Sequence, residues 1–477
     1  MEAIIQFYCF TTTYEIGSNV VGLQALMEQK VIAGQLRLET SNRQILSIAL
    51  PISFALLVPQ FNYLINSFFL ARLGPGYLGA AGITGVYYLI FSVIGFGLNN
   101  GLQALISRRA GQDRLSEIGP LFVQSMYLTL IVSAFGILVT YTLAPAILRS
   151  SIDPELYQQS LSFLKIRIWG LPFLYLYQMR NALLVGTNQS RLLIWGTLAE
   201  TIANVVLDYC LIFGNWGFPD LGFNGAAYAS VIAEAIGMFA VFLIIQFNGL
   251  HKRFALFADL RIKWKEMGLL FSQSSPLIMQ YAISITSWEF FFILISHHGR
   301  LALDISQFMR VIFGFFGIFI WSFAATTTTM VSNVIGQDKR DLVIPLIKKI
   351  ARLSFGFSII LFIPLQIFPA EILRMVQDNE PFIREGVPVL RIVAIAIMLM
   401  SFSTIWLNAV TGTGNTRTNL GIEFITIILY SLYIYFVLER WKMDITYGWM
   451  SEWLYWISMF TMSFLYIRSG KWRAKEI

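Results

Sequence analysis

Twelve long apolar segments constrain this chain more than any other feature of its sequence. A helix needs about 20 predominantly apolar residues to cross a bilayer, and each of the twelve segments can supply them. Apolar residues make up 56% of the chain and charged residues only 13%, which leaves too little polar surface to cover a soluble body. The apolar runs are continuous rather than alternating, so a β-barrel is excluded. We therefore predict an all-α integral membrane protein with twelve transmembrane helices at about 45–71, 80–107, 120–142, 162–185, 192–213, 224–247, 268–296, 303–332, 345–367, 387–410, 419–438 and 446–467.

Lysine and arginine are divided unequally between the predicted loops. Twenty-one of them lie on the side that carries both termini, and seven lie on the other. Because short cytoplasmic loops are enriched in these residues, both termini are expected to be cytoplasmic. The net charge of +7 therefore belongs to one membrane face, and no nucleic-acid partner is expected. Residues 1–43 reach polar residues too soon to span and lack the pattern of a signal peptide, so they are expected to be a cytoplasmic or interfacial extension without function.

The chain repeats itself at an offset of about 225 residues. One register without gaps relates Pro51 to Pro276, Gly74 to Gly299, Leu78 to Leu303, Ser107 to Ser332 and 111–113 to 336–338. Each unit holds six spans, an even number, so the two halves are expected to be parallel repeats with the same topology. This predicts an N-terminal six-helix lobe at 44–247, a cytoplasmic linker at 248–267, a C-terminal six-helix lobe at 268–470 and a cytoplasmic tail at 471–477. A cleft between two such lobes suits alternating access.

Polar side chains in the first half follow a helical spacing. The fifth span carries Glu200, Asn204 and Asp208 four residues apart, and the sixth and first spans add Ser230 with Glu234 and Asn62 with Asn66. At a rise of about 1.5 Å per residue, two layers are expected in the outer half of the membrane, about 6 Å apart. One contains Asp208, Ser230 and Asn66, and the deeper one contains Asn204, Glu234 and Asn62. The second half is expected to be less acidic inside, with Glu423 near the cytoplasmic end of its span.

Carboxylates inside a span are costly and usually mark ion pathways. A buried carboxylate favours a proton, and neighbouring amide and hydroxyl oxygens could instead complete a cation shell, so Na⁺ could be held at Asp208 and Asn204. We interpret Asp208, Asn204, Glu234, Ser230, Asn66 and Glu200 as a site that couples H⁺ or Na⁺, with weaker candidates for a substrate cleft at Asn62, Asn181 and Glu289, the last a lone acid without an evident partner. For each, the alternative is a structural hydrogen bond between helices. No enzyme motif and no cofactor-binding motif is present.

The residues resemble the multidrug and toxic compound extrusion (MATE) family over about 44–470. The similarity is most specific in the run from Asn204 through Asp208 to Gly214 and on to Ala227, and it extends to Pro51 placed fifteen residues before Asn66. The resemblance implies twelve helices in two lobes and an antiporter that uses H⁺ or Na⁺ to export amphipathic, cationic organic compounds. It also implies a monomer in the cytoplasmic (inner) membrane of a bacterium, and a coupling role for Asp208 and Asn204.

One departure changes what the resemblance implies for coupling. Many family members carry an aspartate in the first span where this chain has Asn66, and an amide cannot release a proton at physiological pH. The exchangeable proton is therefore expected to be carried by Asp208 and Glu234. Two other functions are open to a polytopic membrane protein of this kind. A flippase of lipid-linked saccharides would need a strongly basic cleft, and an integral membrane transferase would need a catalytic His/Asp cluster at a membrane face.

Overall fold

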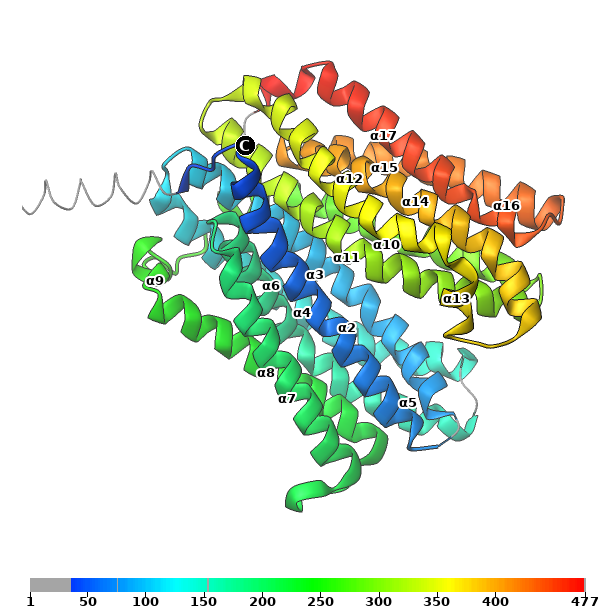
Figure 1. The fold of residues 1–477 in the computed structure, drawn as a ribbon. Coiled ribbons are helices and arrows are strands. Elements are labelled where there is room, and N and C mark those ends of the chain that lie inside the picture. Colours follow the sequence, from blue (N-terminus) through cyan, green and yellow to red (C-terminus); the bar gives the residue numbers. More distant parts are fainter. Residues whose placement is uncertain (1–35, 75, 152–153, 476–477) are drawn as a thin grey trace, which may run out of the picture.

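The structure is a computed structural model that describes residues 36–74, 76–151 and 154–475, and this part of the chain contains helices and no strand (Figure 1). The first lobe consists of α2 (Asn42–Ala71), α3 (Tyr77–Gly111), α4 (Ile118–Ser151), α5 (Pro154–Arg167), α6 (Leu171–Gly186), α7 (Leu193–Phe213) and α8 (Gly222–Phe247). The second lobe consists of α10 (Trp264–Ser296), α11 (Arg300–Gly336), α12 (Val343–Ile367), α13 (Pro369–Arg374), α14 (Glu380–Gly412), α15 (Thr416–Ile434), α16 (Ile445–Trp449) and α17 (Ser451–Arg468).

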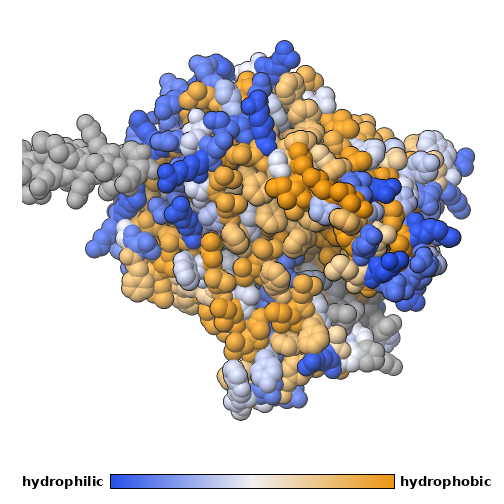
Figure 2. All heavy atoms as spheres, in the orientation of Figure 1, coloured by the Kyte–Doolittle hydropathy of each residue, from blue (hydrophilic) through white to orange (hydrophobic). Residues whose placement is uncertain are grey.

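Ten helices in the described ranges are long and apolar enough to cross a membrane. The two remaining predicted spans, 162–185 and 446–467, coincide with breaks in the helices. A 3₁₀ turn at Ile168–Gly170 divides the fourth span into α5 and α6, and the chain divides again between α16 and α17. Figure 2 shows a broad hydrophobic surface over the middle of the helices, with hydrophilic residues gathered toward their ends. The predicted all-α membrane fold is confirmed, and the fourth and twelfth spans are discontinuous.

Equivalent helices of the two halves end at the same face of the molecule. A Cβ on Gly111, at the end of α3, would lie 2.2 Å from the carbonyl oxygen of Asn333 near the end of α11. The turns that follow are also alike, since Asp113 and Asp338 both adopt positive φ, at 60° and 61°. Repeat-related ends meet at one face only when both halves have the same topology. We call this face, which carries the turns at 111–113 and 336–338, the closed side.

Hydrogen bonds between the lobes lie in the half of the helices nearest the closed side. Gln103 Nε2 donates to Thr329 Oγ1 at 2.8 Å, and Ser332 Oγ donates to the carbonyl of Ala104 at 2.7 Å. At the end of α3, Arg108 Nη2 donates to the carbonyls of Gly412 and Thr413 at 3.1 and 3.2 Å. Of these acceptors, the carbonyls of Gly412 and Thr413 lie where α14 ends and are left without a helical partner.

The segment before α2 also joins the two lobes. Residues 1–35 lie outside the described part of the chain, but Leu36 and Leu38 are buried. Asn333 Nδ2 donates to the carbonyl of Leu36 at 3.0 Å, and Gln337 Nε2 donates to that of Leu38 at 3.0 Å. Ser41 then caps α2 by accepting the backbone N–H of Gln44. The described end of the predicted 1–43 extension is therefore part of the packed closed side.

The predicted linker and tail are both anchored to helices. The linker contains the short helix α9 (Leu250–Arg253) and the start of α10. The side chain of Gln124 on α4 donates to the carbonyl of Arg261 and accepts the N–H of Lys263, at 2.9 and 3.0 Å. In the tail, Trp472 is buried and Arg473 pairs with Asp341 at 2.8 Å. Both segments are thus fixed to the lobes they follow.

The most extensive helix packing positions the polar face of α7. α7 lies against α8 where Gly225 approaches the backbone of α7, and a Cβ on Gly225 would lie 2.3 Å from the carbonyl oxygen of Leu211. The absence of a side chain at Gly225 lets the helices approach closely, as is common in membrane proteins. This contact lies one turn from Asp208 and sets how far α8 stands from it.

We expect Gly225→Ala to destabilise the protein by about 1–3 kcal/mol, because the methyl group forces α7 and α8 apart. Gly85→Ala is the matched control, since a Cβ on Gly85 of α3 would meet nothing within 4 Å. Thermal unfolding of the purified protein in detergent measures both. Equal unfolding midpoints for the two variants would show that the close crossing is not needed.

Candidate functional site

Asn204 and Asp208 lie on the buried face of α7. Their side chains are 3% and 0% exposed, and the spacing of four residues places them one above the other. Asn62 Nδ2 of α2 donates to Asn204 Oδ1 at 2.8 Å. The structure therefore brings together the α2 and α7 members of the predicted deeper layer.

The register of α2 against α7 places Asn66 near the level of Asp208. Both helices begin on the closed side, where Gln44 Nε2 donates to Asn188 Oδ1 at 3.0 Å and Ser190 Oγ contacts the carbonyl of Ser47 at 3.4 Å. The two helices therefore run parallel. One turn beyond the Asn62–Asn204 hydrogen bond, α2 presents Asn66 and α7 presents Asp208.

The polar atoms around Asp208 are buried without partners. Both carboxylate oxygens of Asp208 lack a hydrogen bond, as do Asn62 Oδ1, Asn66 Oδ1 and Asn204 Nδ2. A buried charge with neither donor nor counter-ion is strongly unfavourable, so the carboxylate is stable as a neutral acid or beside a small cation. Carboxylate and amide oxygens are also the ligands that a hard cation uses. This arrangement can bind and release H⁺ or Na⁺.

Glu234 has a different environment from the one expected. Arg167, at the end of α5, donates to Glu234 Oε1 and Oε2 at 2.5 and 2.9 Å, and the hydroxyl of Tyr88 lies 3.2 Å from both oxygens. The Arg167 guanidinium also stacks 3.7 Å from the centre of the Tyr88 ring. Glu234 is therefore charge-balanced by Arg167 in this structure, and its expected share with Asp208 in binding the exchangeable proton stays a prediction. It accepts no hydrogen bond from Asn204 or Asn62 in the described part of the chain.

Arg167 is the functional residue that sequence reasoning missed. It lies inside the predicted fourth span, where an arginine is rare and is usually paired. That rarity was the available signal. It could not identify Glu234 as the partner, because the two residues lie 67 positions apart on different helices.

The remaining candidates are half-buried. Ser230 lies one turn before Glu234 on α8, and Glu200 lies one turn before Asn204 on α7 and against Gly237 of α8. Asn181 follows Arg180, whose guanidinium donates to the carbonyl of Met238 at 2.7 Å. These three residues remain predictions.

Glu289 is not a lone acid. Its Oε1 pairs with Arg310 Nη2 at 3.2 Å, and the Arg310 guanidinium lies over Trp288 and Phe292 at 5.1 and 5.2 Å. The expectation that Glu289 lacks a partner is wrong, because Arg310 of α11 lies beside it. This pairing makes it a weaker candidate for a substrate contact.

The second lobe contains more buried acid than expected. Glu423 is 0% exposed and Glu452 is 4% exposed. Glu423 lies two turns into α15, and Ser284, Gln280 and the Tyr455 hydroxyl bind its carboxylate. The expectation of a less acidic second lobe fails because neighbouring helices, and not the aqueous end of a span, surround these carboxylates.

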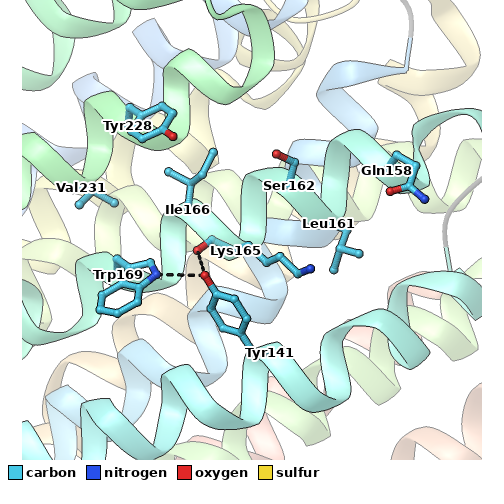
Figure 3. A pocket seen from close by; sticks show the side chains of 9 residues that line it. All are labelled: Tyr141, Gln158, Leu161, Ser162, Lys165, Ile166, Trp169, Tyr228 and Val231. Carbon is cyan, nitrogen blue, oxygen red and sulfur yellow. Dashed lines mark hydrogen bonds between the residues drawn. The ribbon is translucent and has the colours of Figure 1, made fainter.

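A separate groove lies on the surface of the first lobe. Figure 3 shows it between α4, α5 and α8, lined by aromatic, aliphatic and polar side chains including Tyr141, Ser162, Lys165, Trp169 and Tyr228. Trp169 Nε1 donates to the Tyr141 hydroxyl at 3.1 Å, which in turn donates to the carbonyl of Lys165 at 3.3 Å. None of the candidate site residues lines this groove.

Comparison with known proteins agrees with the internal repeat. The sequence profile of the MatE family matches residues 51–210 and 276–436. A probable multidrug resistance protein NorM from Synechocystis sp. is 24% identical over 376 residues, which are 76% of this chain and 80% of the relative. One from Thermotoga maritima is 21% identical over 449 residues, 91% of this chain and 94% of the relative. A solved MATE transporter from Vibrio cholerae superposes with a TM-score of 0.82 at 17% identity, over 94% of this chain and all of that one.

The Arg167–Glu234 pair predicts unequal effects of single and double substitution. Glu234→Leu alone leaves a buried guanidinium without its counter-ion and should cost about 3–5 kcal/mol. Arg167→Met combined with Glu234→Leu removes both charges and should recover most of that stability. Thermal unfolding in detergent of wild type, both single variants and the double variant completes the cycle. If the double variant loses the sum of the two single losses, the two side chains do not interact.

Proposed function

This chain belongs to the MATE family of membrane transporters, and from that premise we propose that it is a multidrug efflux transporter driven by inward movement of H⁺ or Na⁺. The observation that carries the coupling proposal is the buried carboxylate of Asp208, whose two oxygens have no hydrogen-bond partner. A transporter must bind its coupling ion and then release it. A carboxylate without a permanent counter-ion meets both needs, whereas Glu234, held by Arg167, is already neutralised.

The proposed cargo is a small amphipathic organic cation. Asp208 places a negative charge inside the first lobe when it loses its own cation, and that charge attracts a cationic compound. Binding of the compound and binding of H⁺ or Na⁺ then compete for the same carboxylate. Competition of this kind makes the two movements opposite in direction, which is antiport.

Asn66 narrows the choice of coupling residue. Its amide offers one oxygen to a cation but cannot titrate, so the exchangeable proton in this region falls on Asp208. The unpaired oxygens of Asn66 and Asn62 supply neutral ligands if the ion is Na⁺. Either ion would be held by the same carboxylate.

The contacts between the lobes support transport by alternating access. The interlobe hydrogen bonds of Gln103, Ser107 and Arg108 all lie near the closed side. Breaking these bonds while forming others at the opposite end would expose the site to the other compartment. A rocking motion of this kind requires that the lobes behave as separate bodies joined by a linker, here 248–267.

The orientation follows from the loop charges. Arg108, Lys339 and the described ends of the chain lie on the closed side, which is also the side rich in lysine and arginine. Since such residues face the cytoplasm, we propose that the closed side is cytoplasmic. With this orientation the protein exports its cargo from the cytoplasm to the opposite side of the membrane. We further propose that it acts as a monomer in the inner membrane of a bacterium.

The alternative functions are less well supported. The family profile matches both halves of the chain, which does not favour a flippase of lipid-linked saccharides. The first lobe also places an unpaired acid where a flippase for a pyrophosphate group would need bases. Nothing in the described geometry favours a membrane transferase over a transporter.

Asp208→Asn tests the coupling proposal directly. The amide keeps the shape of the carboxylate and removes its charge, so export of a cationic dye should become independent of an imposed H⁺ or Na⁺ gradient. The measurement is dye transport by the purified protein in proteoliposomes, with each gradient applied in turn. We expect gradient-driven transport to fall to the level seen without a gradient.

Asp304→Asn is the matched control. Asp304 is an exposed acid on α11, so the same chemical change there should leave transport unaltered. Normal transport by the Asp208→Asn protein under both gradients would make Asp208 a structural residue and contradict the proposal.

A further inference from the structure

Two carboxylates buried in the second lobe have no role in the first-lobe site. Glu423 of α15 accepts Ser284 Oγ at Oε1 at 2.6 Å and Gln280 Nε2 at Oε2 at 3.4 Å, and the hydroxyl of Tyr455 also donates to Oε1. Its partners therefore come from α10 and α17. Three neutral donors converge on one carboxyl group from two neighbouring helices, which is a built site.

Glu452 lies at the start of α17 and is connected to Glu423 through two tyrosines. Trp456 Nε1 donates to Glu452 Oε2 at 3.0 Å, and the Tyr430 hydroxyl lies 3.5 Å from Oε1. The rings of Tyr430 and Tyr455 meet edge to face with their centres 5.7 Å apart. The order along this chain is Glu452, Tyr430, Tyr455 and Glu423.

No described cation balances either carboxylate. The titratable groups that face them are the phenols of Tyr281, Tyr430 and Tyr455, and none of these carries positive charge. The donors from α10, Ser284 and Gln280, are also neutral. This contrasts with the first lobe, where Arg167 supplies a permanent positive charge to Glu234.

A buried hydroxyl without a partner lies beside these groups. Thr426 Oγ1 makes no hydrogen bond, and the residue is 0% exposed. Thr426 follows Glu423 by three residues and precedes Tyr430 by four, so all three share one face of α15. The unpaired hydroxyl of Thr426 is therefore free to bond a group that enters the site.

We propose that Glu423 and Glu452 form a second proton-binding site, built inside the second lobe from α10, α15 and α17. Each carboxylate takes up one proton to become a neutral carboxylic acid and returns it on release, with no other bond made or broken. Protonation removes the uncompensated charge that burial would otherwise impose. Proton binding itself is independent of the proposed function, and only a role in transport rests on it.

The site is positioned to influence the contact between the lobes. Gln280 and Ser284 lie on either side of Tyr281, whose hydroxyl accepts Asn100 Nδ2 of α3 at 2.6 Å. Loss of the proton from Glu423 creates a negative charge that attracts the Ser284 and Gln280 dipoles more strongly. The same turn of α10 holds the first lobe through Tyr281, so the protonation state of Glu423 biases this interlobe hydrogen bond.

Infrared spectroscopy of the purified full-length protein in detergent tests the proposal. We use the Asp208→Asn protein as the background, so that Asp208 gives no signal, and each further variant is compared with this background in a difference spectrum, in which the signal of Glu200 cancels. At neutral pH we expect a carbonyl absorption from protonated carboxyl groups. Adding Glu423→Gln or Glu452→Gln should each remove part of this absorption, and adding both should remove the sum of the two parts.

Glu371→Gln, at an exposed position on α13, is the matched control and should leave the absorption unchanged. Glu423→Asp keeps a carboxyl group and should shift the absorption without removing it, which serves as the test if the glutamine variant fails to fold. A difference spectrum without a carbonyl band between the Asp208→Asn background and the double glutamine variant would overturn the proposal. This outcome does not depend on whether Asp208 couples transport.

Discussion

A carboxylate inside a membrane protein must be neutralised, because the hydrocarbon core offers no water to solvate its charge. The acids of this chain meet that requirement in three ways. Glu234 and Glu289 have arginines, Glu423 and Glu452 have neutral donors, and Asp208 has neither. The acids paired to arginine have a permanent counter-ion. Those without a cation are stable only as neutral acids or beside a bound cation, and we propose that this difference separates structural acids from functional ones.

The helix packing determines which acids remain unpaired. Gly225 brings α8 close to α7 one turn from Asp208, while the 3₁₀ turn at Ile168–Gly170 directs Arg167 toward Glu234. The Arg167 guanidinium is thereby committed to Glu234 and Tyr88. Asp208 is thereby left without a cation among the described side chains.

The sequence predicted those features of the fold that follow from apolar run length, internal repetition and helical spacing. Apolar run length predicted the spans, and the offset of about 225 residues predicted parallel halves. The four-residue spacing on two parallel helices predicted the contact of Asn62 with Asn204. Pairings between distant helices could not be predicted in the same way. Arg167 with Glu234 and Arg310 with Glu289 depend on helix rotation and on breaks in the helices, and neither leaves a periodic signal.

The burial of Glu423 and Glu452 shows a second limit of sequence reasoning. Glu423 lies only two turns from the start of α15, which suggested that water surrounds it. In the structure, side chains of α10 and α17 cover it. The depth of a residue along its own helix does not fix its exposure when neighbouring helices extend past it. The second lobe therefore contains an acidic interior that differs from the first in residues and in position.

The central claim is that Asp208 holds the coupling ion until the cargo displaces it. The most direct measurement is the number of protons or Na⁺ ions released when the purified protein binds tetraphenylphosphonium in detergent, compared between wild type and Asp208→Asn. The account predicts release by the wild type and a clear reduction in the variant, because the variant has no carboxylate at that position to exchange ions. Equal release by both proteins at equal occupancy would contradict it.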